Sequence, residues 1–180
     1  MKVSREEVAE NRERILEAAG RLFRKRGFED VTVAEIMQAA RLTHGAFYGY
    51  FKSKEELIAE SLAAALTPEP GAKPIPLSEY ADRYLREGHR DDPESGCLFA
   101  ALGSEAVRAN GDVRHIMTEA LQRLIANFSR TAPGKTEAAR RRAAIGSWSA
   151  MVGAVILARL ADDEALSDDI LAETRAWIGE

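Results

Sequence analysis

The sequence is poor in the residues that build disulfides, metal centres and membrane spans. Cys97 is the only cysteine among 180 residues, which excludes an intrachain disulfide and a cysteine-rich zinc site. The longest nearly uninterrupted apolar run, residues 150–158, is well short of the roughly 18 residues that suggest a membrane span. Residues 1–14 are dense in charge and lack the apolar stretch of a secretion signal. We therefore expect a cytoplasmic protein that contacts no membrane and uses no metal or other cofactor.

An overall excess of basic charge is also missing, since the formal net charge is −4. The charge is unevenly distributed along the chain. Residues 1–54 hold 11 Lys and Arg against 8 Asp and Glu, whereas residues 55–180 hold 14 against 21. Any contact with nucleic acid is therefore expected in the N-terminal part.

Apolar residues recur at helical spacing in nearly every segment, and no long segment alternates with the period of a strand. Ser4, Thr32 and Ser53 are each followed three residues later by Glu, a pattern typical of helix starts. Residues 67–76 contain four of the six prolines and form the clearest linker. Beyond it, helices are predicted over residues 77–88, 98–109, 112–130, 136–160 and 167–178. The predicted fold class is all-α.

Residues 32–54 are typical of a helix-turn-helix unit, whose second helix enters the major groove of DNA. We predict a helix of about two turns, a tight break at Arg41 and Leu42, and a second short helix that Thr43 caps. The small core between the two helices should contain five apolar residues: Ile36, Ala39, Leu42, Phe47 and Phe51.

The remaining residues of the unit suit contact with DNA. His44 can reach a base edge, and the Tyr48 hydroxyl on the same face can donate to a phosphate. Small residues at the helix start allow close approach, and lysines after the helix neutralise phosphates. The predicted contact residues are Thr32, Arg41, Thr43, His44, Gly45, Ala46, Tyr48, Tyr50, Lys52 and Lys54. Alternatively, the aromatic residues form only a core cluster, which we expect for the two Phe but not for the two Tyr.

From Ile15 to Leu57 the order of residues resembles the DNA-binding domain of the tetracycline-repressor (TetR) family. The resemblance rests on Gly27-Phe28, Val31-Thr32-Val33, Gly45-Ala46-Phe47-Tyr48 and the closing run from Phe51 to Leu57. It implies an N-terminal three-helix DNA-binding domain, residues 1–54, and a C-terminal helical effector-binding and dimerisation domain, residues 55–180. It further implies a one-component regulator, a repressor, that binds palindromic operator DNA as a homodimer and is released by a small molecule.

Two residues of the unit depart from the family pattern. Arg41 stands where the family usually has Gly, at a position that commonly takes a left-handed backbone. We predict that Arg41 keeps the positive φ and that its side chain points toward phosphate. Gly49 replaces a bulky aromatic residue.

The C-terminal part offers residues for a dimer contact and for an effector cavity. Late apolar stripes, each of which contains Trp, predict an interface of Ile145, Trp148, Val152, Val155, Ile156, Ile170, Thr174, Trp177 and Ile178. Aromatic and Met side chains suit an apolar or aromatic effector, with candidate contacts Tyr80, Tyr84, Cys97, Phe99, Met117, Leu121, Phe128, Trp148 and Met151. Packing within the chain would account for the same residues.

Other functions have less support. Gly134-Lys135-Thr136 resembles the end of a phosphate-binding loop, but the required first Gly is missing. A Cys97 nucleophile with His89 as base lacks an orienting third group, so we do not expect an enzyme. Two alternatives remain: a regulator without a small-molecule effector, and a ligand-binding protein of the same fold that has lost specific DNA binding.

Overall fold

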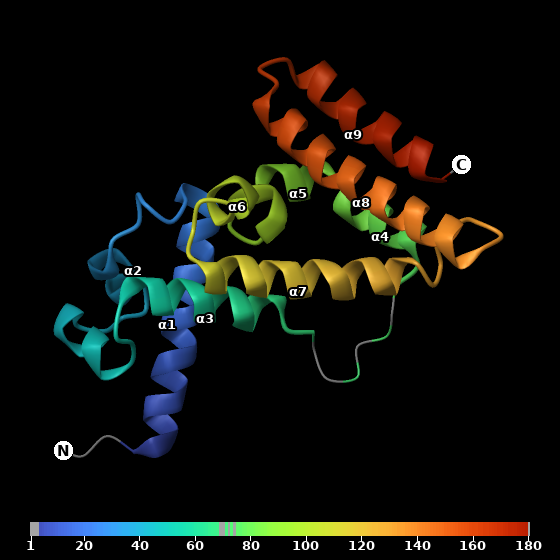
Figure 1. Ribbon diagram of the computed structural model, residues 1–180. Helices are drawn as coiled ribbons and strands as arrows, with labels where there is room; N and C mark the ends of the chain where they lie inside the picture. The colour runs from blue at the N-terminus through green and yellow to red at the C-terminus, as the bar shows by residue number, and fades with distance from the viewer. Residues whose placement is uncertain (1–3, 69–70, 72, 74, 180) are drawn as a thin grey trace.

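All secondary structure in the described residues is helical, as predicted. The computed structural model describes residues 4–68, 71, 73 and 75–179, so part of the predicted linker lies outside the described residues. Along the chain (Figure 1) the elements are α1 (Arg5–Arg26), α2 (Val33–Ala39), the 3-10 helix η1 (His44–Gly49), α3 (Lys54–Leu66), α4 (Leu77–Tyr84), α5 (Glu87–Asp91), α6 (Leu98–Ala106), α7 (Gly111–Phe128), α8 (Glu137–Leu160) and α9 (Glu164–Gly179).

The three helix starts marked by Ser or Thr are confirmed. The Ser4 hydroxyl accepts the Glu7 amide at 3.0 Å, and Ser53 does the same for Glu56 at 3.2 Å. Thr32 forms a complete capping box at the start of α2. These contacts supply partners for amides that the first turn of each helix leaves unpaired.

The predicted helix over residues 77–88 is two helices. Leu85 leaves the helical conformation with φ −91° and ψ 64°, and Arg86 is extended. The buried Leu85 side chain packs into the C-terminal core, so the chain turns there before α5 begins. The helix predicted over residues 98–109 ends earlier than expected, at Ala106.

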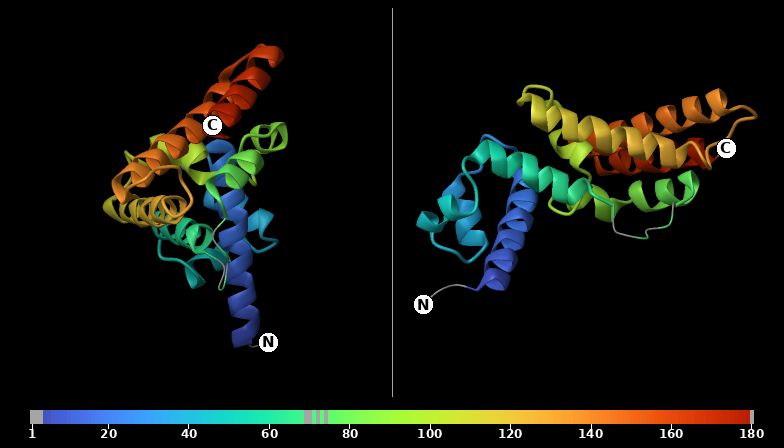
Figure 2. Two further views of the ribbon diagram at one scale, coloured as in Figure 1. Left: turned by 90° about the vertical axis from the view of Figure 1, so that its right-hand side faces the viewer. Right: turned by 60° about the horizontal axis from the view of Figure 1, so that its bottom comes forward.

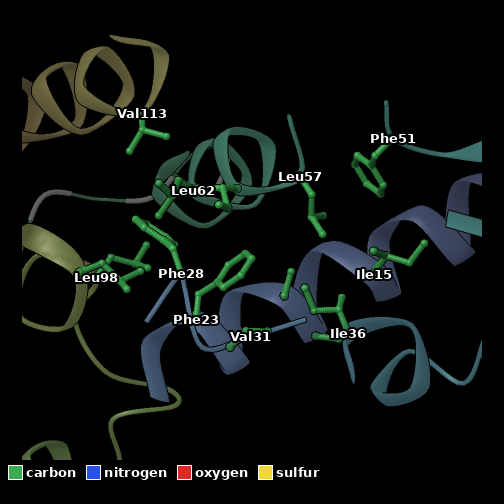
Figure 3. Close-up of a cluster of buried hydrophobic side chains, with 14 of the residues drawn as sticks. Ile15, Phe23, Phe28, Val31, Ile36, Phe51, Leu57, Leu62, Leu98 and Val113 are labelled. Atoms are coloured by element: carbon green, nitrogen blue, oxygen red, sulfur yellow. The ribbon is translucent and has the colours of Figure 1, made fainter. Parts of the chain in front are cut away.

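The N-terminal core is built from both halves of the chain. Figure 3 shows Ile15, Phe23, Ile36 and Leu57 pointing toward one another between α1, α2 and α3. Leu98, Leu102 and Ala106 of α6 and Val113 and Met117 of α7 complete this cluster. The helices around the helix-turn-helix unit are therefore packed directly on the C-terminal helices.

A second core lies among α4, α7, α8 and α9. The hairpin of α8 and α9 lies at the end of the molecule away from α2 and η1 (Figure 2). By length and composition α8 could cross a membrane, alone among the helices of the described residues. Its apolar residues Trp148, Met151 and Val155 are buried in the C-terminal core, and this packing accounts for part of its composition.

Candidate nucleic-acid interface and effector cavity

The turn between α2 and η1 has the geometry predicted for Arg41. Its φ is 58°, the only positive value at a non-Gly position in the described residues. The Arg41 amide donates to Gln38 O at 3.0 Å and the Leu42 amide to Met37 O at 2.8 Å. This pair of bonds is a Schellman motif, which requires a left-handed residue after the helix. The exposed Arg41 side chain is thus placed at the rim of the turn.

The second helix of the unit is a 3-10 helix, and Thr43 stands at its N-cap as predicted but does not cap it with its side chain. The Thr43 side chain makes no capping bond, whereas its carbonyl accepts the Ala46 amide at 3.0 Å. Gly45 and Gly49 weaken the preference for a regular α-helix, and tight turns of this type occur in short pieces. Phe47 holds the segment to the core by stacking on Phe51, with ring centroids 5.8 Å apart.

Exposure divides the predicted contact residues into two groups. Thr43, His44, Gly45 and Tyr48 are exposed, and Tyr48 has 74% of its surface accessible. Ala46 is half-buried against the N-terminal core. The small exposed residues leave the backbone of η1 open to a close partner, with His44 and Tyr48 projecting from it.

Tyr50 is not an outward-facing residue, contrary to the prediction. It is half-buried, and its hydroxyl accepts a hydrogen bond from Asn11 Nδ2 at 3.2 Å. Ala39 is likewise misplaced by the prediction, because it is exposed while Ala40 lies in the core. The Schellman turn sets which of these two alanines faces inward.

A polar brace on α1, which the sequence analysis missed, holds the turn in place. Asn11 is only 8% exposed and accepts from Arg14 Nη1 at 3.0 Å. Arg14 also donates to the Ala40 carbonyl, next to the left-handed Arg41. Asn11 lies one turn before Ile15 on the buried stripe of α1. A polar residue at this otherwise apolar position is the sequence feature that indicates the brace. Through Ala40 and Tyr50 the brace ties the end of α2 and the residue after η1 to α1.

The predicted phosphate contacts differ in their availability. Both donors of Thr32, its amide and its hydroxyl, bind Glu35 Oε2 at 2.8 and 2.7 Å. Arg26 pairs with the same carboxylate at 2.7 Å and, together with Thr32, lowers the pKa of Glu35 to about 2. Lys52 is exposed, and Lys54 donates to the Glu29 carbonyl at 3.4 Å. Within the described residues neither lysine has a carboxylate at ion-pair distance.

A cavity of about 500 Å³ lies where the two halves of the molecule meet. Five of the predicted effector contacts line it: Tyr80, Tyr84, Cys97, Phe99 and Trp148. An adjoining cavity of about 440 Å³ shares Tyr80 and Phe99 and adds Phe128. The aromatic rings touch one another, as in the edge-to-face contact of Phe99 with Trp148 at 5.7 Å between centroids.

Three predicted effector contacts do not line either cavity. Met117 lies in the N-terminal core, because its face of α7 is turned toward α3. Met151 is fully buried, and Leu121 packs against the C-terminal core. Their side chains serve packing, which was the other explanation of the same pattern.

His89 holds the loop at the edge of the cavity. Its Nδ1 lies 2.7 Å from the Tyr84 carbonyl, and its Nε2 accepts the Cys97 amide at 3.1 Å. Because Nε2 accepts, Nδ1 must carry the proton and donate to the carbonyl. Burial lowers the pKa of His89, which favours this neutral form.

The predicted dimer residues also fall into two groups. Trp148, Val155 and Ile178 are buried within their own chain, so their assignment to an interface is corrected. Val152, Ile170 and Thr174 are half-buried. The exposed members are Ile145, Ile156 and Trp177, and they share the α8–α9 hairpin with the exposed Leu157, Leu160 and Leu166.

Comparisons with known proteins agree with this architecture. Residues 15–61 match the family described as bacterial regulatory proteins, tetR family. The transcriptional regulator TtgR of Pseudomonas putida is 46% identical over 55 residues, 31% of this chain and 26% of that protein. The transcriptional repressor NemR of Escherichia coli is 26% identical over 131 residues, 67% of this chain and 66% of its own.

Solved structures extend the likeness of the fold to nearly the whole chain. The reduced form of E. coli NemR aligns with a TM-score of 0.66 at 22% identity, covering 93% of this chain and 94% of that one. A TetR regulator from Legionella pneumophila aligns with a TM-score of 0.72 at 21% identity and the same coverage. The relatives with identities of 40% or more are matched over only about a quarter of their length or less. These relatives are regulators, in line with the expectation that the chain is not an enzyme. Residues 15–61 carry the DNA-binding segment of the TetR family of bacterial regulatory proteins, and nearly the whole chain has the fold of TetR regulators.

Proposed function

We propose that the protein is a homodimeric, one-component transcriptional repressor that acts in the cytoplasm, binds palindromic operator DNA and is released by a small aromatic effector. The observation that carries the proposal is the form of η1. An exposed, narrow segment bearing His44 and Tyr48 follows a Schellman turn and is anchored to the core by the buried Phe47. A segment that is anchored to the core and has an accessible backbone suits insertion into the major groove of DNA.

The exposed residues divide into base and phosphate contacts. His44 is the candidate for a base edge, because it begins η1 and is exposed. Arg41, Lys52 and Lys54 supply positive charge beside it and fit phosphate contacts, which position the protein without selecting sequence. Tyr50 acts in this proposal through Asn11, by positioning η1.

The exposed face of the α8–α9 hairpin is the proposed dimer contact. Ile156 is 44% and Trp177 59% exposed, and large apolar side chains gathered on one face are typical of interface cores. A two-fold dimer places its two recognition segments about 34–36 Å apart, one turn of DNA, when it reads a palindrome.

The aromatic cavity is the proposed effector site. Its volume of about 500 Å³ falls in the usual range for small-molecule sites. It is lined by residues of α1 as well as α4, α6 and α8, so an occupant touches both halves of the molecule. A ligand that binds the released form better than the DNA-bound form would shift the equilibrium between them.

The test is selection of bound fragments from a random DNA pool, with the oligomeric mass of the purified protein measured alongside. We expect one palindromic motif and the mass of a dimer. The matched variants are His44→Ala and Ser78→Ala, the second a change of an exposed residue on α4. Failure to recover any motif at low salt would refute the operator-binding proposal and favour a ligand-binding protein of the same fold.

A further inference from the structure

Arg24 is a cation of the DNA-binding half that lines the effector cavity. It lies in the last turn of α1, is half-buried, and shares the cavity with Tyr84, Phe99 and Trp148. Its Nε donates to the Glu94 carbonyl. That bond uses one donor of the guanidinium and neutralises none of its charge.

Two neighbouring cations on α1 form ion pairs with a carboxylate, whereas Arg24 does not. Glu94 pairs with Lys25 at 2.6 Å and with Arg21 at 3.7 Å. Asp92 instead accepts the Ser95 hydroxyl at 2.7 Å. In the described part of the chain no carboxylate lies within ion-pair distance of Arg24, and burial lowers its pKa. Asp92 offsets part of this effect from beyond ion-pair distance. A half-buried charge without a close partner is costly, so an anion is favoured beside it.

Arg24 is also the one lining cation without such a partner in the described residues. Arg83, the other arginine of the cavity wall, pairs with Glu79 at 2.5 Å. His89 is held neutral by its two hydrogen bonds. One positive charge among aromatic walls matches a ligand with a single negative charge better than a phosphate, whose second charge would stay unpaired.

Tyr84 gives independent evidence that the cavity suits a ligand with a polar group. It is 5% exposed, and its hydroxyl has no hydrogen-bond partner. A buried hydroxyl without a partner is uncommon in native proteins, and a ligand is one of its explanations. Cys97 lies beside it in the cavity wall, but sulfur is a weak acceptor.

We infer that the cavity binds an aromatic monocarboxylate, with its ring against Trp148 and Phe99 and its carboxylate on the Arg24 guanidinium. This inference rests on the proposed effector site and names the chemical class of its ligand. Arg24 and Asn11 lie 13 residues apart on α1, about 20 Å at 1.5 Å per residue. A ligand bound to Arg24 thus contacts the same helix whose Asn11 braces η1.

The experiment compares two probes of equal shape on the full chain by calorimetry: 2-naphthoate and its neutral analogue 2-naphthamide. We expect the carboxylate to bind at least about tenfold more tightly, since charge-assisted bonds to Arg are the stronger ones. Arg24→Gln should abolish this preference. Arg21→Gln should keep it, because Arg21 lies on the same helix but outside the cavity.

Equal affinity for the two probes, absence of naphthoate binding, or an unchanged preference in Arg24→Gln would overturn the inference. The comparison on the unaltered protein does not depend on the folding of any variant. Selection of operator DNA tests the proposed function separately. A selected palindrome together with equal probe affinities would retain the regulator and reject the carboxylate ligand, whereas a naphthoate preference without any DNA motif would do the reverse.

Discussion

Replacing Tyr84 with Phe should stabilise the ligand-free protein. The substitution removes a hydroxyl that is buried without a partner and keeps the ring contacts, at 5.4 Å to Trp148 and 5.8 Å to Tyr80 between centroids. Burying an unpaired hydroxyl costs about 1–3 kcal/mol in proteins. The nearby Cys97 sulfur offsets a small part of this cost. We therefore expect a gain of about 1–2 kcal/mol in the free energy of unfolding.

The assay is thermal or urea unfolding at a fixed protein concentration, since the proposed dimerisation would make the midpoint depend on concentration. For a chain of this length a gain of 1–2 kcal/mol raises the midpoint by about 2–8 °C. Tyr80→Phe is the matched control, because Tyr80 lines the same cavity but is only half-buried, and a change within about 0.5 kcal/mol is expected. Loss of stability in Tyr84→Phe would refute the argument, since it would show that the hydroxyl has a partner in the folded protein.

Four further results are expected at the DNA-binding and dimer surfaces. His44→Ala should relax the sequence preference, whereas Lys54→Ala should lower the affinity for all DNA sequences about equally and flatten its salt dependence. The measurement is DNA titration at several salt concentrations, and an equal loss of affinity for all sequences in both variants would contradict the base contact of His44. Arg41→Gly should raise the unfolding free energy by about 1 kcal/mol, because Gly takes the left-handed conformation at φ 58° without strain, and a destabilised variant in urea would argue against this. The Glu35 carboxyl should titrate by NMR near pH 2 and not near its ordinary 4.5, so its contribution to stability is present above the ordinary value and is lost as pH falls toward 2; a normal titration would exclude the ion pair. Trp177→Glu should convert the dimer to a monomer in a mass measurement, and an unchanged mass would place the contact elsewhere.

Local features of the fold could be predicted from the sequence because they depend on residues close together in the chain. A Ser or Thr three residues before Glu marks a helix start because its hydroxyl accepts a hydrogen bond from the amide of that Glu, as at Ser4, Thr32 and Ser53. The positive φ of Arg41 was predicted from the resemblance to the TetR family, which usually has Gly at this position, and it is confirmed. The cap expected of Thr43 failed, because two nearby glycines and the anchored Phe47 make η1 a 3-10 helix.

The sequence could not decide which neighbours a helix face meets. The apolar stripe on α8 predicted a dimer interface, yet Trp148 and Val155 of that stripe pack inside the chain while Ile156 remains exposed. Met117 suited a cavity by its chemistry and lies in the other core. Such assignments depend on helix pairs far apart in sequence, which periodicity does not specify.

By itself the sequence determined the all-α class, the helix starts, the left-handed turn at Arg41 and the family that the residues from Ile15 to Leu57 resemble. The tertiary structure alone decided three features. Asn11 braces Tyr50, Arg24 lines the cavity between the two halves without a carboxylate at ion-pair distance, and the Tyr84 hydroxyl is buried without a hydrogen-bond partner. The physical reason is the separation along the chain of the residues that interact. Caps and turns are set by hydrogen bonds within a few residues, whereas burial, ion pairing and cavities arise only where distant segments pack together.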